Sequence, residues 1–266
     1  MADAKDLPGA NGLEKGNFLT GAEGLTGAKD LASGKDLADV ERRTEKAGRT
    51  ARPDILIMTA VDAERDAVLR GLADCPRVEV RLAGVGPAMA AARTAAALAG
   101  GGWRLVVSAG IGGGFAGAAE IGGLVLADVI AAADLGVETP DGFLPVDELG
   151  FGSSRIAADP AWSDRLARRI EAAGLPLRRG PVLTVSTATG TAATAAERAR
   201  RVPGAAAEAM EGFGVAAAAA EAGVPVVELR AISNAVGPRD RAAWRIPDAL
   251  AALSAAFAAA KEVFES

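Results

Sequence analysis

Two acidic residues and one arginine lie where a charged side chain needs an explanation. Glu64 lies one turn into a predicted helix, and Glu211 lies in an otherwise apolar stretch where a strand gives way to a helix. Each could simply favour a helix start through the helix dipole, or could be a carboxylate aimed into a pocket as a general base or charge stabiliser. Arg230 lies within a predicted buried strand, where an unpaired charge is costly, so we expect it to have a partner.

Several classes of catalytic site are excluded by composition. The 266 residues include no histidine and no tyrosine, which excludes Ser-His-Asp, Cys-His and HExxH sites and most zinc chemistry. The single cysteine, Cys75, excludes an internal disulfide and a CxxC motif and fits a reducing, cytoplasmic setting. A formal net charge of −5 provides no electrostatic reason to expect nucleic acid or an anionic membrane as a partner.

The composition changes near residue 50. Five of the six lysines precede that point, in a glycine-rich segment that repeats Ala-Lys-Asp-Leu and Gly-Lys-Asp-Leu. Its isolated leucines cannot offset the backbone entropy lost on ordering, so we expect residues 1–52 to be a disordered extension. A docking or regulatory tail is the alternative. Residues 53–266 are expected to form one domain, in a soluble protein without a transmembrane span or secretory signal.

From residue 54 onward, short apolar segments alternate with longer amphipathic ones. This alternation predicts an α/β domain whose central sheet is mixed but largely parallel and is flanked by helices. The predicted strands cover residues 55–59, 78–83, 105–109, 124–132, 182–186 and 226–233. The predicted helices cover residues 63–72, 88–99, 160–173, 191–201, 211–222 and 247–264. Ligands bind at the carboxyl ends of strands in such sheets, so we expect the site there.

Two strand ends carry unusual residues. Residues 112–117 match GxGxxG, but no helix opens at these glycines, as a dinucleotide-binding loop would require. We interpret residues 110–114 as a flat glycine turn that backs closely onto a ligand, or else as a plain tight turn. The strand that carries Arg230 ends on Ser233 and Asn234, and the asparagine would also suit a turn before Gly237-Pro238.

Four motifs together resemble one enzyme superfamily. They are Thr59-Ala-Val-Asp-Ala-Glu64, Ala109-Gly-Ile-Gly-Gly-Gly114, Glu208-Ala-Met-Glu211 and Arg230-Ala-Ile-Ser-Asn234. Their order and spacing are similar to those of the purine nucleosidase and phosphorylase superfamily. The closest resemblance is to the branch with methylthioadenosine/S-adenosylhomocysteine nucleosidase, and within it to futalosine hydrolases. The resemblance covers about residues 54–264 and implies the nucleoside phosphorylase-like fold.

The resemblance also implies roles for residues at matching positions. Glu64 matches the carboxylate that positions and activates the attacking water, and Arg230 matches a residue that supports the water site. Glu211 matches the carboxylate that binds the ribose hydroxyls, with Met210 packing on the sugar. The other expected substrate contacts are Ser233, Gly110, Ile111, Gly112, Thr187, Ala188 and Thr189, the last three in a segment that presents backbone to the base. Neither a metal ion nor a cofactor is implied.

Two positions depart from the adenosine-type enzymes of this branch. Ile111 lies where those enzymes have a serine near the water, so the water is held differently or the serine is dispensable. Asn234 lies where they have an aspartate that protonates or hydrogen-bonds N7. A 6-oxopurine presents the acceptor O6 beside N7, and an asparagine can offer its NH2 to O6 and its carbonyl to a protonated N7. Asn234 therefore predicts hypoxanthine over adenine, with the N7 proton coming from solvent.

We expect hydrolysis of the N-glycosidic bond of futalosine to hypoxanthine and dehypoxanthinyl futalosine, a step resembling the futalosine route to menaquinone. The alternatives are a methylthioadenosine-type nucleosidase, an inosine phosphorylase and a noncatalytic nucleoside-binding protein. The substrate carries a carboxyphenyl group beyond the ribose, and Arg239, Arg241 or Arg245 could supply a cation for it. The resemblance further implies a homo-oligomer, a dimer or larger.

Overall fold

Strands and helices follow one another largely as the hydrophobic pattern predicts. The computed structural model describes residues 52–266, so the extension predicted over residues 1–52 lies outside the described part except for its last residue. The strands are β1 (Ile55–Thr59), β2 (Val78–Leu82), β3 (Leu105–Gly114), β4 (Leu124–Ala132), β5 (Gly136–Thr139), β6 (Gly142–Pro145), β7 (Arg155–Ala157), β8 (Leu177–Thr184), β9 (Ala207–Ala209) and β10 (Val226–Ala235). The helices are α2 (Asp62–Leu72), α3 (Pro87–Leu98), α4 (Val146–Leu149), α5 (Pro160–Ala172), α6 (Ala192–Arg201), α7 (Gly212–Glu221), the 3-10 turn η1 (Arg241–Ala243) and α8 (Ile246–Glu265). Within residues 52–266, no helix is both long and apolar enough to cross a membrane.

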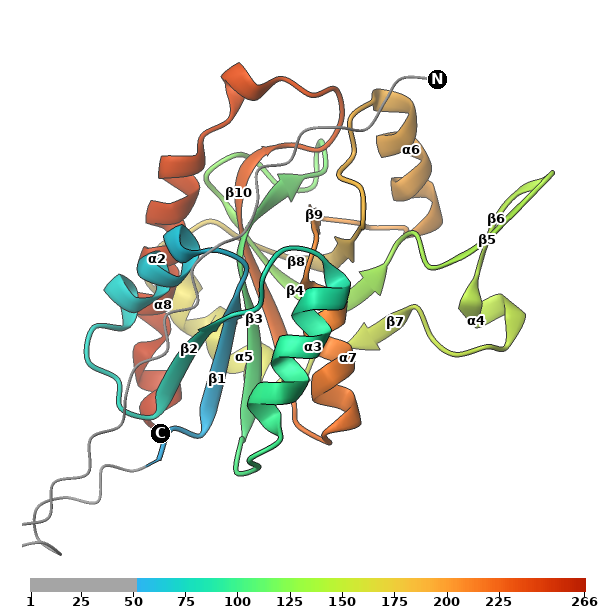
Figure 1. Cartoon of the computed structure of the whole chain (residues 1–266). Coiled ribbons are helices and arrows are strands. Elements are labelled where there is room, and N and C mark those ends of the chain that lie inside the picture. The colour runs from blue at the N-terminus through green and yellow to red at the C-terminus, as the bar shows by residue number, and fades with distance from the viewer. Residues whose placement is uncertain (1–51) are drawn as a thin grey trace, which may run out of the picture. The chain divides into compact units, whose positions relative to one another are not determined.

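Eight of the strands form one mixed sheet (Figure 1). Strand β1 is parallel to β2 and β3, and β3 is parallel to β10. Strand β8 is parallel to β4 and to β9, whereas the β10–β4, β3–β9 and β4–β7 pairs are antiparallel. The pairing of β10 with β3 closes a ring of strands through β4, β8 and β9. The predicted α/β class with a largely parallel sheet flanked by helices is therefore confirmed.

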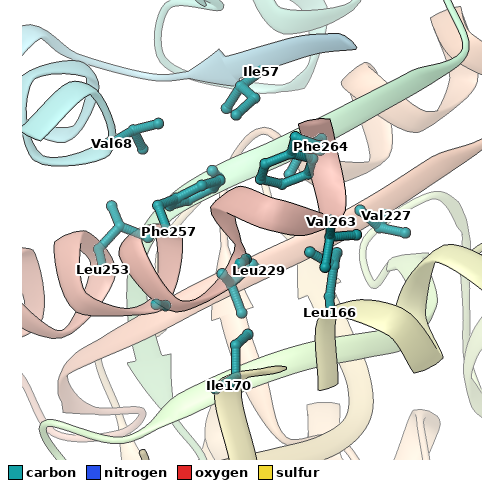
Figure 2. Packing of buried hydrophobic residues seen from close by; sticks show 14 of the residues in the cluster. Ile57, Val68, Leu166, Ile170, Val227, Leu229, Leu253, Phe257, Val263 and Phe264 are labelled. Atoms are coloured by element: carbon teal, nitrogen blue, oxygen red, sulfur yellow. The ribbon is translucent and has the colours of Figure 1, made fainter. Parts of the chain in front are cut away.

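Helices α2, α5 and α8 cover one face of the sheet, with α8 packed on α2 and on β10 (Figure 1). Because successive strand residues point to opposite faces, Ile57 turns toward these helices and its neighbour Leu56 turns away. The α8 side chains Phe257 and Phe264 lie at the centre of this cluster, with ring centroids 6.1 Å apart (Figure 2). Burial of this apolar surface provides most of the driving force that holds these helices on the sheet.

Helices α3 and α7 cover the opposite face. Their contact is close at Gly214, where an added Cβ would lie 2.1 Å from the carbonyl oxygen of Pro87. The approach brings the N-terminus of α7 and the loop before α3 to the same end of the sheet as the carboxyl ends of β1, β3 and β10. The close packing of these two helices therefore helps to position the residues around the candidate site.

The prediction of a glycine turn over residues 110–114 is wrong. These residues continue β3, with Gly113 paired to Glu208 of β9 on one side and to Asn234 of β10 on the other. Glycine has a low intrinsic preference for strands. Here the hydrogen-bonded pairing with the two flanking strands, β9 and β10, stabilises the extended conformation nevertheless. Strand β8 begins at Leu177 rather than at residue 182. The short elements β5, β6, α4, β7 and β9 are not found by periodicity because each covers at most four residues.

Candidate active site

The ends of six strands, β2 among them through Val85, surround one cavity of about 270 Å³. The segments that follow β1, β8, β9 and β10 contribute to its lining, as does the glycine-rich end of β3. The predicted site residues among its lining are Glu64, Met210, Glu211, Ser233, Asn234, Ile111, Gly112, Ala188 and Thr189. Three others, Gly110, Thr187 and Arg230, lie beside the cavity without lining it. The structure therefore brings together residues that are as far as 170 positions apart in the chain, from Glu64 to Asn234.

The carboxylate of Glu64 is held by backbone N–H groups. Its Oε1 accepts a hydrogen bond from the N–H of Ile111 at 2.9 Å, and its Oε2 accepts one from the N–H of Ala60 at 2.9 Å. The second oxygen also accepts from the N–H of Val61 at the start of α2, so Glu64 both caps this helix and lines the cavity. Ile111 contributes a backbone donor at the position where the resemblance led us to look for a serine.

Burial raises the pKa of Glu64 above its usual value of 4.5. The positive charge of Arg230 and the N–H of Ile111 act in the opposite direction without cancelling the effect, and the nearby charge of Glu211 adds to it. A carboxylate that is only 3% exposed and whose pKa is raised is a suitable acceptor for a proton from water near neutral pH.

The guanidinium of Arg230 lies beneath the cavity and is bound on every side. Its Nε donates to Glu228 at 2.8 Å, its Nη1 to Glu211 at 3.3 Å, and its Nη2 to the hydroxyl of Ser108 at 3.0 Å. The expectation that this buried arginine has a partner is confirmed. Burial lowers the pKa of Arg230, but the charges of Glu228, Glu211 and Glu64 outweigh that effect and raise it overall. Arg230 therefore stays positively charged and offsets part of the negative charge around the cavity.

Glu228 was not singled out from the sequence, although it lies two residues before Arg230 and on the same face of β10. It is fully buried, and burial raises its pKa more than Arg230 lowers it. One oxygen accepts from Arg230, whereas the other has no hydrogen-bond partner among residues 52–266. Gly212 lies directly over this carboxylate, because an added Cβ would be 2.2 Å from either oxygen.

Gly110 lies where the side chains of Glu64 and Arg230 converge. A Cβ at this position would be 2.5 Å from Oε1 of Glu64 and 2.7 Å from Nη1 of Arg230. The absence of a side chain therefore lets the two charged groups cross the backbone of β3. This close approach explains the glycine even though Gly110 does not line the cavity itself.

Glu211 is positioned at the start of α7 but makes no capping hydrogen bond with its side chain. One oxygen accepts from Arg230, and the other accepts from the N–H of Gly86 in the loop before α3 at 3.4 Å. The structure thus contradicts the alternative that Glu211 merely caps a helix. Glu211 lines the cavity next to Met210.

The amide of Asn234 has a defined orientation. Its Oδ1 accepts from the hydroxyl of Ser233 at 2.8 Å, and its Nδ2 donates to the carbonyl of Ala235 at 2.9 Å. One N–H and one oxygen lone pair remain for a ligand. The floor beside this amide is open because Gly113 lacks a Cβ, which would lie 3.2 Å from Nδ2.

A second buried ion pair, between Arg198 and Glu208, was not predicted from the sequence, and Glu208 lines the cavity. Arg198 of α6 lies 2.7 Å from Glu208 of β9, and Glu208 also accepts from the N–H of Thr189 at 2.8 Å. Arg198 donates in addition to the carbonyl of Thr187 at 2.9 Å, so that carbonyl is already engaged within the protein. The pair thereby fixes the segment that carries Ala188 and Thr189 against the cavity. Within residues 52–266, no cluster of carboxylates and thiols is arranged to hold a metal ion.

Comparisons with known proteins place the chain in a family. The model of the phosphorylase superfamily matches residues 55–264. The futalosine hydrolase of Streptomyces coelicolor is 58% identical over 233 residues, which is 80% of this chain and 97% of that protein. The futalosine hydrolase of Acidothermus cellulolyticus is 49% identical over 217 residues, 77% of this chain and 88% of that protein.

Solved structures extend the similarity of the fold. The structure of futalosine hydrolase from Helicobacter pylori has a TM-score of 0.69 at 16% identity, covering 80% of this chain and 98% of that one. A methylthioadenosine/S-adenosylhomocysteine nucleosidase from Neisseria meningitidis has a TM-score of 0.68 at 18% identity, and the match covers 78% of this chain and 98% of that one. At these identities the two structures show a shared fold.

Replacement of the buried guanidinium tests how strongly the site depends on it. We expect Arg230→Met to lower the free energy of unfolding by about 3–5 kcal/mol at neutral pH, because carboxylates remain buried without a counter-charge. Without the guanidinium, the pKa values of Glu64 and Glu228 rise further above 4.5. The loss in the free energy of unfolding should therefore shrink as the pH falls toward 4.5, because these carboxyl groups become protonated and neutral. Urea unfolding at several pH values measures both effects.

Arg245→Met is the matched control, because Arg245 forms an exposed pair with Asp248 that should contribute at most about 1 kcal/mol. Equal losses in the two variants would contradict the central role of Arg230.

Proposed function

The chain belongs to the phosphorylase superfamily, and we propose that it is a nucleosidase that hydrolyses the N-glycosidic bond of futalosine to hypoxanthine and dehypoxanthinyl futalosine. The observation that carries the proposal is the 58% identity to a futalosine hydrolase over 97% of that protein's length. The cavity at the strand ends supports it independently, because buried carboxylates surround a space suited to a nucleoside-sized ligand.

The proposed reaction uses the carboxylates in two ways. Cleavage of the bond between ribose and base leaves positive charge on the sugar, and the carboxylates of Glu64 and Glu211 stabilise that charge. Glu211 also accepts hydrogen bonds from the ribose hydroxyls. Glu64 takes a proton from the water that attacks the sugar from the face opposite the base. Arg230 holds the carboxylate of Glu211 from below, whereas the backbone N–H groups of Ala60 and Ile111 hold that of Glu64.

Water is favoured over phosphate as the nucleophile for an electrostatic reason. Glu64, Glu208 and Glu211 all line the cavity and would repel a phosphate dianion. Two buried cations near these carboxylates are already paired, Arg230 with Glu228 and Glu211 and Arg198 with Glu208, which leaves Arg239 as the one unpaired cation among the described lining residues. This charge balance supports hydrolysis rather than phosphorolysis.

Asn234 is proposed to recognise the base. Its free N–H is available to O6 of hypoxanthine, and its carbonyl oxygen can accept from a protonated N7. The carbonyl of Ala235 already receives one N–H of the amide, so the orientation with the oxygen toward Ser233 is favoured before a ligand binds. The amide cannot act as an acid, so the proton on N7 comes from solvent.

The proposal extends to the setting of the enzyme. A step toward menaquinone would place it in the cytoplasm, and the lone cysteine, Cys75, which is buried, is compatible with a reducing compartment. We also propose that it acts as a homo-oligomer, as the resemblance implies.

Release of free base tests the proposed reaction directly. We expect the full chain to release hypoxanthine from futalosine at the same rate with and without phosphate, and to release little adenine from methylthioadenosine. Chromatography of the products measures all four conditions. Release that requires phosphate would indicate a phosphorylase, whereas preferential release of adenine would indicate a methylthioadenosine-type enzyme.

Glu64→Gln removes the proposed base while nearly preserving shape. We expect kcat for futalosine to fall by about 10²–10⁴-fold. The unsubstituted enzyme should lose activity as the pH falls through the pKa of Glu64, because the protonated carboxyl cannot accept a proton. This acidic limb should lie above pH 4.5, since burial raises that pKa.

Asp62→Asn is the control for Glu64→Gln, because Asp62 lies in the same first turn of α2 but is largely exposed. It should retain activity within about threefold. Full activity of Glu64→Gln, with its fold verified by circular dichroism, would remove Glu64 from the mechanism.

Asn234→Asp tests recognition of the base. A carboxylate opposite O6 sets acceptor against acceptor, whereas it can accept from the amino group of adenine. We expect the ratio of kcat/KM for hypoxanthine release over adenine release to fall by about 10²-fold or more, since unpaired buried polar groups discriminate strongly. The pair of substrates is futalosine and its 6-amino counterpart, and Asn234→Ala separates loss of contact from reversal of preference. An unchanged ratio in Asn234→Asp would show that the amide does not recognise O6.

A further inference from the structure

We propose that Arg239 binds the carboxylate of the 5′-carboxyphenyl group of futalosine and thereby selects nucleosides with an acidic aromatic 5′-substituent. This assignment rests on the proposed function, because it concerns the part of the substrate that lies beyond the ribose. From the sequence, Arg239, Arg241 and Arg245 are equal candidates for this contact. The structure distinguishes among them.

Only one of these arginines is placed to contact a ligand. Arg239 lines the cavity, whereas Arg241 and Arg245 do not. Arg245 is engaged by Asp248, with Nε and Oδ2 2.8 Å apart. In the described part of the chain, no hydrogen bond or ion pair occupies the guanidinium of Arg239, so it is available to an incoming carboxylate.

The charges around the cavity require such a group. The acidic residues in its lining are Glu64, Glu208 and Glu211, and Arg239 is the one cation among the described lining residues. The buried guanidinium of Arg198 is paired with Glu208, and Arg230 is paired with other carboxylates. A substrate that carries its own negative charge would be repelled unless a free cation met it at the entrance.

The cavity that Arg239 lines also has apolar groups suited to an aromatic ring. The indole of Trp244 lines the cavity, with its ring centroid 5.5 Å from the guanidinium carbon of Arg239. Val61 and Val85, from the loops after β1 and β2, line the cavity with side chains that are 43% and 58% exposed. These three apolar groups can cover a phenyl ring and would otherwise remain in contact with water.

The contact with Trp244 helps to orient the guanidinium. A cation over an aromatic face is attracted to it, which restricts a long and otherwise mobile side chain. The planar guanidinium can then offer two parallel N–H groups to one carboxylate, a geometry that lysine cannot reproduce. Arg239 therefore acts as a specificity determinant for the 5′-group and takes no part in bond cleavage.

A pair of substrates separates recognition of the charge from catalysis. We expect Arg239→Ala to lower kcat/KM for futalosine by about 10- to 100-fold, mainly through KM, because a hydrogen bond to a charged group is lost. For the analogue in which a primary amide replaces the carboxylate, the loss should be smaller than about threefold. Arg239→Lys should give an intermediate loss on futalosine.

Arg241→Ala is the matched control, since Arg241 also lies near Trp244, 6.0 Å from its ring centroid, but does not line the cavity. Arg241→Ala should not appreciably reduce kcat/KM for futalosine or for its amide analogue. Equal losses on both substrates in Arg239→Ala, or no loss on futalosine, would overturn the assignment of Arg239 and leave the proposed reaction intact. Failure of the unsubstituted protein to hydrolyse futalosine would instead overturn the proposed function, and with it this assignment.

Discussion

The structure of the candidate site depends on one buried guanidinium. Arg230 is 1% exposed and touches the carboxylates of Glu228 and Glu211, with that of Glu64 close by. Without it, carboxylates would be buried together without a counter-charge, and ionisation of one would oppose ionisation of the next. With it, charged groups can coexist in the buried layer beneath the cavity. The pairing of β10 with β3 places this guanidinium below the cavity.

The same constraint accounts for Gly110 of β3. The side chains of Glu64 and Arg230 must approach each other across this strand, and Gly110 lies at their point of approach. Farther along, Gly113 lies between Glu208 on β9 and Asn234 on β10 and leaves the floor between them free. Three neighbouring strands therefore present an acid, a bare backbone and an amide side by side. A flat base can lie on such a floor because no side chain projects from it.

Much of this architecture could be predicted from the sequence, because apolar periodicity reports burial and burial selects strands and helices. The buried strand with Arg230 and the helix after Glu211 are clear for this reason. The glycine segment was misinterpreted because its extended conformation is imposed by β9 and β10, which are distant in the chain. The Arg198–Glu208 pair was missed for a similar reason: Arg198 lies on a helix that looks polar and solvated, and only tertiary packing turns it toward β9. The resemblance to a known family pointed mainly to residues that line the cavity. It did not point to Glu228 or Arg198, which bind those residues or their neighbours without lining the cavity.

Most polar side chains around the cavity are held in place by other protein groups. Arg230, Arg198 and the amide of Asn234 are all held by protein groups, so little reorganisation is needed when a nucleoside enters. This matters in a chain without histidine, since no imidazole is at hand to donate a proton near neutral pH. The proposed reaction must then proceed by stabilising charge at fixed positions, with Glu64 as the one group that exchanges a proton. Rigid carboxylates beside the sugar and a fixed amide beside the base are suited to that task, whereas a mobile site would lose the stabilisation as its dipoles turned.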